Sequence, residues 1–288
     1  MANGYIIIDK PEGITSHGVV SCVRRAYACK RVGHSGTLDP MATGVLPMFV
    51  GRATRACEFA LCDDKTYEAT LQWGISTDTQ DITGRVLSAS QIAVTEADML
   101  DVLAGFTGTI TQTPPMYSAL KRGGVPLYAL ARAGVEVERE RREVVVSRLE
   151  MTSFDPESRQ CALVVSCGKG TYIRTLCDDI GKALGCGACM AGLRRTRAGI
   201  FDIADAVTLE QLAEAPQAHL RPLERMFEAY TRIAVSREQE SIIRNGAAFP
   251  VSDVEDGTYR VCSHSGEFLM LGRAGHGIMN TIKSFFEV

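Results

Sequence analysis

A single carboxylate, Asp39, stands at the centre of a loop whose residue types fix an irregular backbone. Residues 33–47 read GHSGTLDPMATGVLP, a stretch with three glycines and two prolines. Pro40 restricts Asp39 to extended conformations and therefore directs its side chain. A carboxylate held in this way can act as a nucleophile. The alternative is an Asp-Pro turn without a chemical role, which is the commonest use of that dipeptide.

Two other side chains suited to chemistry lie far from Asp39 in the chain. Arg174 carries a planar guanidinium that can hold a carboxylate through two hydrogen bonds. It could equally be a surface charge that pairs with Asp178 four residues later on a helix. Tyr67 offers a ring for stacking and a hydroxyl for proton transfer, or is an ordinary aromatic residue of a strand. Spacing alone leaves both pairs of interpretations open.

The elements that must position these residues follow from periodicity and from capping and breaking residues. We expect one helix to begin at Ser16, as N-cap, and to end at Gly33. Further helices are expected at 52–61, 95–104, about 171–184 and 237–244. Strands are expected at 5–8, 45–50, 66–73, 143–151, 160–167 and 188–197, with an ordered loop at 33–44.

Strands and helices follow one another without a βαβ rhythm, which predicts an α+β fold. We expect a catalytic domain at 1–230 and a small β-rich module at 231–288. Residues 113–142 contain Thr-Pro-Pro, a Gly-Gly pair and an Arg/Glu-rich run. This composition predicts a long, mobile insertion, and such insertions are usually functional or disordered.

The composition is that of an ordinary globular protein: of 288 residues, 45% are hydrophobic and 23% are charged. We see neither a signal peptide nor a run of the roughly 18 apolar residues that a membrane helix needs. The expected location is the cytoplasm, where disulfides are rare. Of the ten cysteines, only Cys186 and Cys189 have C-x-x-C spacing, and no second pair completes four metal ligands. We therefore expect neither a metal nor a cofactor.

The charge is segregated along the chain, although the net charge is only −3. Three stretches are basic: 9–55 has a net charge of +4, 119–148 of +3 and 169–197 of +4. Such segregation can place a basic face on an acidic protein, as a polyanion partner requires. Solvated helix faces that happen to cluster are the alternative.

The loop around Asp39 resembles the catalytic motif of the TruB-type tRNA pseudouridine synthases, whose GTLD core is intact at 36–39. Three further blocks resemble motifs of the same family in the same order: DKPEGITS at 9–16, KTYE at 65–68 and GKGTYIRTL at 168–176. Four ordered blocks over about residues 4–197 make an accidental match far less probable than a lone motif does.

This resemblance implies a pseudouridine synthase domain with a mixed, mainly antiparallel central sheet, and a PUA-like RNA-binding module at the C-terminus. It implies that Asp39 is the catalytic carboxylate, that Arg174 holds and orients it, and that Tyr67 is the active-site tyrosine. Three further positions match family residues: His34 would fill the space left by the flipped base, Asp81 would contact the RNA and Leu193 would pack in the active site. Tyr172 would line the same pocket or belong to the core, and Lys10 would shape the floor of the site.

The implied reaction converts uridine 55 in the T loop of tRNA to pseudouridine, without a cofactor, after the base is flipped out of its stack. The T arm of tRNA is the implied partner of a monomeric enzyme, and residues 119–142 are expected to become ordered on it. Three alternatives are a relative that works in a guide-RNA particle, an RNA chaperone and a glycoside hydrolase. A hydrolase normally needs two carboxylates, and the motifs offer one.

Overall fold

The computed structural model describes residues 2–60 and 64–286, and the chain forms two compact units. Unit 1 comprises Met1–Pro40, Leu46–Leu61 and Ala204–Val288, and unit 2 comprises Met41–Val45 and Cys62–Ile203. The expected boundary at residue 230 stays a prediction. Within the described residues, no helix combines the length and the apolar character that crossing a bilayer requires.

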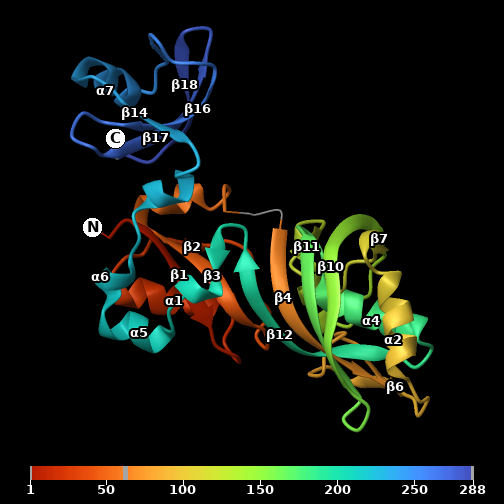
Figure 1. The fold of residues 1–288 in the computed structure, drawn as a ribbon. Helices are drawn as coiled ribbons and strands as arrows, with labels where there is room; N and C mark the ends of the chain where they lie inside the picture. Colours follow the sequence, from red (N-terminus) through yellow and green to blue (C-terminus); the bar gives the residue numbers. More distant parts are fainter. Residues whose placement is uncertain (1, 61–63, 287–288) are drawn as a thin grey trace. The chain divides into compact units, whose positions relative to one another are not determined.

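Unit 2 is built on a mixed sheet in which long antiparallel strands dominate (Figure 1). In order across the sheet, the strands are β3 (Thr43–Val50, with its first residues in this unit), β12 (Ala188–Ala198), β4 (Asp64–Trp73), β11 (Gln160–Gly168), β10 (Arg142–Asp155) and β7 (Gly108–Gln112). Only the contact between β3 and β12 is parallel among these pairs. The short β13 (Phe201–Asp202) pairs with β12. The prediction of a mixed, mainly antiparallel sheet is confirmed.

One face of this sheet is buried because its strands alternate between apolar and polar residues. Tyr67, Ala69, Leu71 and Trp73 of β4 are buried. Helix α4 (Ile173–Ala183) follows β11 along the chain, and eight of its eleven residues are buried. Helices α4 and α2 (Glu96–Ala104) contact each other and lie on the same side of the sheet (Figure 1).

The expected insertion at 113–142 contains three short elements that the sequence did not predict. Strands β8 (Lys121–Arg122) and β9 (Val125–Pro126) form a hairpin, and α3 (Leu127–Arg132) follows it. A second small hairpin, β5 (Ile75–Thr77) and β6 (Val86–Ala89), lies earlier in the unit. Ordering of the insertion on RNA stays a prediction.

Unit 1 contains the N-terminal strands and the helices around them. Strands β1 (Gly4–Lys10) and β2 (Val32–His34) pair with β3. The helical segments are α1 (Ser16–Ala26), η1 (Gly51–Ala56), η2 (Ile203–Asp205, which begins at the unit boundary), α5 (Leu209–Glu214), α6 (Pro216–His219) and η3 (Leu223–Phe227).

Two expected helices differ from those observed. The N-cap of α1 is Thr15, whose side chain accepts a hydrogen bond from the Gly18 amide, so Ser16 as N-cap was wrong. The same helix ends at Ala26, not at Gly33, because Ala28 adopts a left-handed backbone (φ 48°). The expected helix at 52–61 is a short 3₁₀-helix at Gly51–Ala56 followed by turns, and residue 61 lies outside the described residues.

The C-terminal part of unit 1 forms a five-stranded sheet with one helix, as the expected β-rich module requires. The strand order is β14 (Thr231–Ala234), β16 (Gly257–Cys262), β17 (Phe268–Gly275), β18 (Ile278–Ser284) and β15 (Phe249–Pro250), and the helix is α7 (Arg237–Arg244). Val261, Leu269, Met270 and Met279 are among the fully buried residues of its own core. The helix at 237–244 was predicted with these bounds.

Candidate active site

Asp39 lies half-buried in the loop between β2 and β3, and unit 1 holds the backbone on both sides of it. On one side, the Ser16 hydroxyl donates to the Leu38 carbonyl oxygen (3.0 Å) and accepts from the Leu38 amide (2.9 Å). On the other side, the Gly13 amide donates to the Pro40 carbonyl oxygen (2.8 Å). The segment after β1 therefore fixes the backbone that carries the carboxylate.

Lys10, the last residue of β1, has a fully buried side chain that contacts the backbone of the same loop. Its ammonium donates to three carbonyl oxygens, those of Pro11 (2.9 Å), Ile14 (2.8 Å) and Pro40 (3.1 Å). Burial lowers the pKa of Lys10 to about 8, against the opposing effect of the Asp39 charge. All three donor hydrogens of the ammonium have acceptors, so Lys10 shapes the floor of the loop.

His34 is the last residue of β2, where it lies opposite Met48 of β3. It is half-buried in unit 1, the unit that also contains Asp39 and Lys10. These three predicted site residues thus belong to one unit. The other five belong to unit 2.

Tyr67 and Leu193 lie on one face of the unit 2 sheet. Tyr67 of β4 is opposite Arg195 of β12, and Leu193 is opposite Ala69. Directly opposed residues of antiparallel strands point to the same face, and so do residues two apart. Tyr67 is 7% exposed, and Leu193 is half-buried. Tertiary structure therefore brings together two predicted residues that are 126 positions apart in the chain.

Helix α4 covers that same face. The pKa of Cys177 on α4 is raised, first by burial and then by the neighbouring thiols of Cys161 and Cys189. Cys161 of β11 is opposite Leu71 of β4, which shares its face with Tyr67. The helix that carries Arg174 therefore packs on the face that carries Tyr67.

Arg174 is the second residue of α4 and is 5% exposed. Its guanidinium donates to the carbonyl oxygens of Thr79 (3.0 Å) and Tyr117 (2.8 Å), and its Nε lies 3.9 Å from an Asp81 carboxylate oxygen. Asp178 does not pair with Arg174 in this structure: it accepts from Lys182 (2.6 Å) and from the Gln80 amide (3.0 Å). The alternative prediction, that Arg174 is a solvated surface charge of its helix, is wrong because packing buries the side chain.

Asp81, at 6% exposure, is more buried than a surface contact to RNA would suggest. One of its carboxylate oxygens accepts hydrogen bonds from Thr79, from the Thr83 amide and from the Thr83 hydroxyl. Its other oxygen faces Arg174. In this arrangement Asp81 holds its own turn together and helps to place the guanidinium.

Tyr172 immediately precedes α4 as its N-cap. The Gln112 side chain accepts from the Tyr172 amide (3.0 Å) and donates to the Tyr172 carbonyl oxygen (3.2 Å). The guanidinium of Arg142 lies over the Tyr172 ring, 5.0 Å from its centroid. Tyr172 is thus held at both its backbone and its ring.

Arg195 and Gln112 were not among the predicted site residues. Arg195 is 1% exposed beside Tyr67, and its Nε donates to the Val45 carbonyl oxygen (2.8 Å). An arginine at an inward position of a predicted alternating strand is the signal that could have identified it. Gln112 stands just before Thr-Pro-Pro, and no local pattern marks it.

The C-x-x-C pair consists of two buried free thiols, Cys186 and Cys189. Burial raises the pKa of Cys189 to about 11, as expected for an inert core thiol. In the described part of the chain, no group of three or more His, Cys, Asp or Glu side chains is placed to hold a metal ion.

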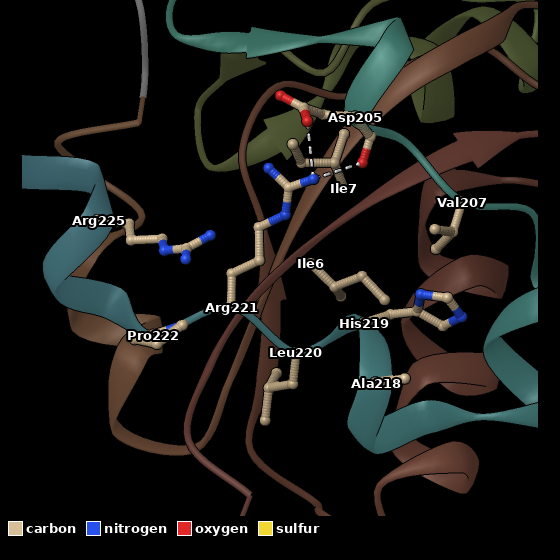
Figure 2. Close-up of a pocket in the computed structure, with 10 residues that line it drawn as sticks. All are labelled: Ile6, Ile7, Asp205, Val207, Ala218, His219, Leu220, Arg221, Pro222 and Arg225. Carbon is tan, nitrogen blue, oxygen red and sulfur yellow. Dashed lines mark hydrogen bonds and ion pairs between the residues drawn. The ribbon is translucent and has the colours of Figure 1, made fainter.

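Unit 1 also contains a pocket of about 390 Å³ (Figure 2). It lies against Ile6 and Ile7 of β1 and the segment around α6 and η3. Its Arg221 side chain is paired with Asp205 at 2.9 Å. The pocket lining contains none of the predicted site residues, so it plays no part in the catalytic hypothesis.

Comparisons with known proteins show similarity over most of the chain. The model of the "TruB family pseudouridylate synthase (N terminal domain)" matches residues 24–173, and that of the "tRNA pseudouridylate synthase B C-terminal domain" matches 174–228. The tRNA pseudouridine synthase B of Azoarcus sp. (strain BH72) is 43% identical over 276 residues, which are 94% of this chain and 91% of the relative. That of Pseudomonas putida (strain GB-1) is 44% identical over 279 residues, again 94% and 91% of the two chains.

Two similar solved structures come from RNA-protein and protein complexes. One is described as "Structure of H/ACA RNP bound to a substrate RNA containing 2'-deoxyuridine", with a TM-score of 0.71 and 25% identity, covering 99% of this chain and 85% of the other. The second, "Crystal Structure of a Cbf5-Nop10-Gar1 Complex", has a TM-score of 0.71 and 27% identity, with 98% and 85% covered. With a family model that spans more than half of the sequence and relatives 43–44% identical over nearly all of it, the chain belongs to the TruB family of pseudouridine synthases.

Proposed function

We propose that this enzyme converts uridine to pseudouridine in tRNA, at position 55 of the T loop, with the T arm as its binding partner. The relatives that are 43–44% identical over 94% of the chain are named tRNA pseudouridine synthase B. The similar structure of an H/ACA particle is only 25% identical. The greater similarity to the tRNA enzymes favours tRNA as the substrate over a role in a guide-RNA particle. We propose that the enzyme acts on tRNA as a monomer.

The reaction is an isomerisation that needs no external reactant. The N1–C1′ bond of uridine breaks, the base turns, a C5–C1′ bond forms, the C5 proton leaves and N1 gains a proton. A carboxylate starts this sequence, as a nucleophile or by promoting cleavage of the glycosidic bond. In our proposal that carboxylate is Asp39.

The observation that carries this assignment is the support of Asp39 on both sides. Leu38 is tied to Ser16, and Pro40 is tied to Gly13 and Lys10. An Asp-Pro turn without a role would need no such double anchoring from a segment about 25 residues away in the chain. A side chain held by a fixed backbone loses little entropy when it attacks.

Arg174 and Tyr67 complete the proposed centre. We assign to Arg174 the bidentate pairing with Asp39, which fixes the orientation of the carboxylate in a pocket that receives a base. Tyr67 stacks on the flipped base, and its phenol oxygen takes the C5 proton as its own proton passes to water. The supporting observations lie within unit 2: the buried, carbonyl-anchored guanidinium and the shared sheet face of Tyr67, Leu193 and α4.

Substrate entry requires the uridine to leave its stack, at a cost of a few kcal/mol. We assign to His34 the space left by the flipped base, and to Tyr172 a wall of the base pocket. The C-terminal sheet, which has a hydrophobic core of its own, would act as a PUA-like RNA-binding module.

The test is tritium release from 5-tritiated uridine in a T-arm minihelix. Wild-type protein should release tritium, and Asp39→Asn should bind the minihelix with unchanged affinity but release none. An RNA chaperone is the second candidate, because its function needs binding alone. If wild-type protein binds and refolds tRNA without releasing tritium, the chaperone function replaces the isomerase.

A further inference from the structure

Gln112, the last residue of β7, has a side chain with no solvent exposure and an unusual pair of partners. Its carbonyl oxygen accepts from the Tyr172 amide (3.0 Å), and its amide nitrogen donates to the Tyr172 carbonyl oxygen (3.2 Å). The side chain thus makes with Tyr172 the two hydrogen bonds that a neighbouring strand would make.

These bonds matter because Tyr172 belongs to neither a strand nor the body of a helix. As N-cap of α4 it has an extended backbone (φ −103°, ψ 113°), and its side chain makes no capping hydrogen bond. The Tyr172 carbonyl oxygen also accepts from the Leu176 amide (3.0 Å), but its amide donates to Gln112, and a partly buried amide that loses its partner costs about 1–3 kcal/mol. Gln112 therefore fixes the direction in which α4 starts, two residues before Arg174.

Arg142 acts on the same residue from the neighbouring strand. In the β7–β10 pair, Arg142 lies directly opposite Gln112. Its guanidinium covers the Tyr172 ring at 5.0 Å and donates to the Gly170 carbonyl oxygen. Two opposed residues of one strand pair thus hold Tyr172, Gln112 by its backbone and Arg142 by its ring.

The chain that leaves Gln112 also reaches Arg174. Five residues later, the Tyr117 carbonyl oxygen accepts from the Arg174 guanidinium (2.8 Å). Pro114 and Pro115 lie between and stiffen the connection. A displacement of Gln112 would therefore move both the start of α4 and one of the acceptors that place Arg174.

We propose that Gln112 is a positioning residue of the isomerisation: it sets Tyr172 and Arg174 in place without touching the substrate. This inference rests on the proposed function, which assigns those two residues to the active centre. It predicts that loss of the two hydrogen bonds slows the chemical step while RNA binding stays intact.

The experiment compares Gln112→Met and Gln112→Glu in the full-length protein by single-turnover tritium release at saturating minihelix. Gln112→Met keeps the size of the side chain and removes both bonds, so the rate should fall about 10- to 100-fold, the usual effect of a displaced catalytic group. The Kd for the minihelix should change by less than about threefold, since no phosphate contact is removed. Gln217→Glu, at an exposed position of α6, is the control and should match wild type.

The pH dependence of the Gln112→Glu rate distinguishes a positioning role from a purely structural one. An ionised glutamate cannot donate to the Tyr172 carbonyl oxygen, but a protonated one donates to it and still accepts from the amide. Its rate relative to wild type should therefore recover as pH falls from 8 to 6, with burial favouring the protonated form. The Gln112→Met ratio should stay flat over the same range.

Each result supports or overturns one of the two proposals. Tritium release by wild type with an equal rate for Gln112→Met would overturn the positioning role alone. A Gln112→Glu ratio that does not change with pH would do the same, even if Gln112→Met fails to fold. No release by wild type would instead overturn the proposed function.

Discussion

The ammonium of Lys10 donates a hydrogen bond to the carbonyl oxygen of Pro40 (3.1 Å), the residue directly after Asp39. With two more carbonyl acceptors and no solvent exposure, this lysine is a structural cation beneath the proposed catalytic loop. Its charge state should therefore affect both activity and stability. As pH rises above 8, activity should fall, whereas the contribution of Lys10 to the free energy of unfolding should rise.

For activity, we expect a loss as the Lys10 ammonium deprotonates. Burial lowers its pKa to about 8, so the positive charge beside Asp39 and one of the three donor hydrogens disappear above that pH. The single-turnover rate should fall as pH rises through about 8. Lys10→Met should be slow at every pH and lack this decline. An alkaline decline that Lys10→Met retains would have another origin.

The contribution of Lys10 to the free energy of unfolding should change with pH in the opposite direction to activity. Its pKa is about 8 in the folded protein and near 10.5 when unfolded, so between these values the unfolded state binds more protons. The unfolding free energy of wild type, measured relative to Lys10→Met, should therefore rise from pH 8 to pH 10.5. Urea titrations at several pH values would measure it, and a difference that falls with pH would contradict the lowered pKa.

Ser16 should be needed for the other side of the Asp39 loop. Ser16→Ala leaves the buried amide and carbonyl of Leu38 without their shared partner, which should cost about 1–3 kcal/mol of stability. Activity should fall more than minihelix binding does. Ser21→Ala, which removes an exposed hydroxyl of the same helix, is the control and should leave both unchanged. Equal stability of the two variants would refute the anchoring role.

Arg174 should not tolerate replacement by lysine. A lysine keeps the charge but cannot form a fork of hydrogen bonds to a carboxylate while also reaching the carbonyls of Thr79 and Tyr117. We expect Arg174→Lys to bind the minihelix normally and to lose most tritium release. Arg85→Lys, at an exposed ion pair of the same unit, serves as the matched change. Near-normal turnover of Arg174→Lys would remove the bidentate pair from the mechanism.

Gly44 should be irreplaceable because β12 approaches its backbone. A Cβ added there would lie 2.2 Å from the Arg195 carbonyl oxygen, at a φ of +99°. Gly44→Ala should cost more than about 3 kcal/mol of stability. Gly185 has a similarly positive φ (+73°), but a Cβ added there would meet nothing within 4 Å. Gly185→Ala is therefore the control for backbone strain alone and should cost about 1 kcal/mol. Comparable melting temperatures for the two variants would argue against the clash.

The insertion should be protected by its RNA partner. Lys121 and Arg122, in the β8–β9 hairpin, are exposed sites for trypsin. If residues 119–142 close on the T arm, bound tRNA should slow cleavage there more than at the exposed Arg85. Equal cleavage with and without tRNA at both sites would count against closure.

Local patterns in the sequence determined most of the regular elements. Alternation placed the strand at 66–73, and helical spacing with good caps placed the helices at 95–104 and 237–244, because these signals depend on neighbours in the chain. The catalytic hypothesis for Asp39 likewise came from its loop and from motifs in order. Where two adjacent residues could both cap, as Thr15 and Ser16 can, the sequence did not distinguish them. Ser16 is used instead by Leu38, 22 residues away.

Only tertiary structure decided which partners the polar side chains have. Arg174 and Asp178 have the spacing of a helix ion pair, yet burial of α4 turns the guanidinium to Thr79 and Tyr117 and leaves Asp178 to Lys182. Gln112 has no local signal, because its function depends on Tyr172, 60 residues later. Such partners are chosen by the requirement that every buried polar group be satisfied, and that requirement applies only once the chain has packed.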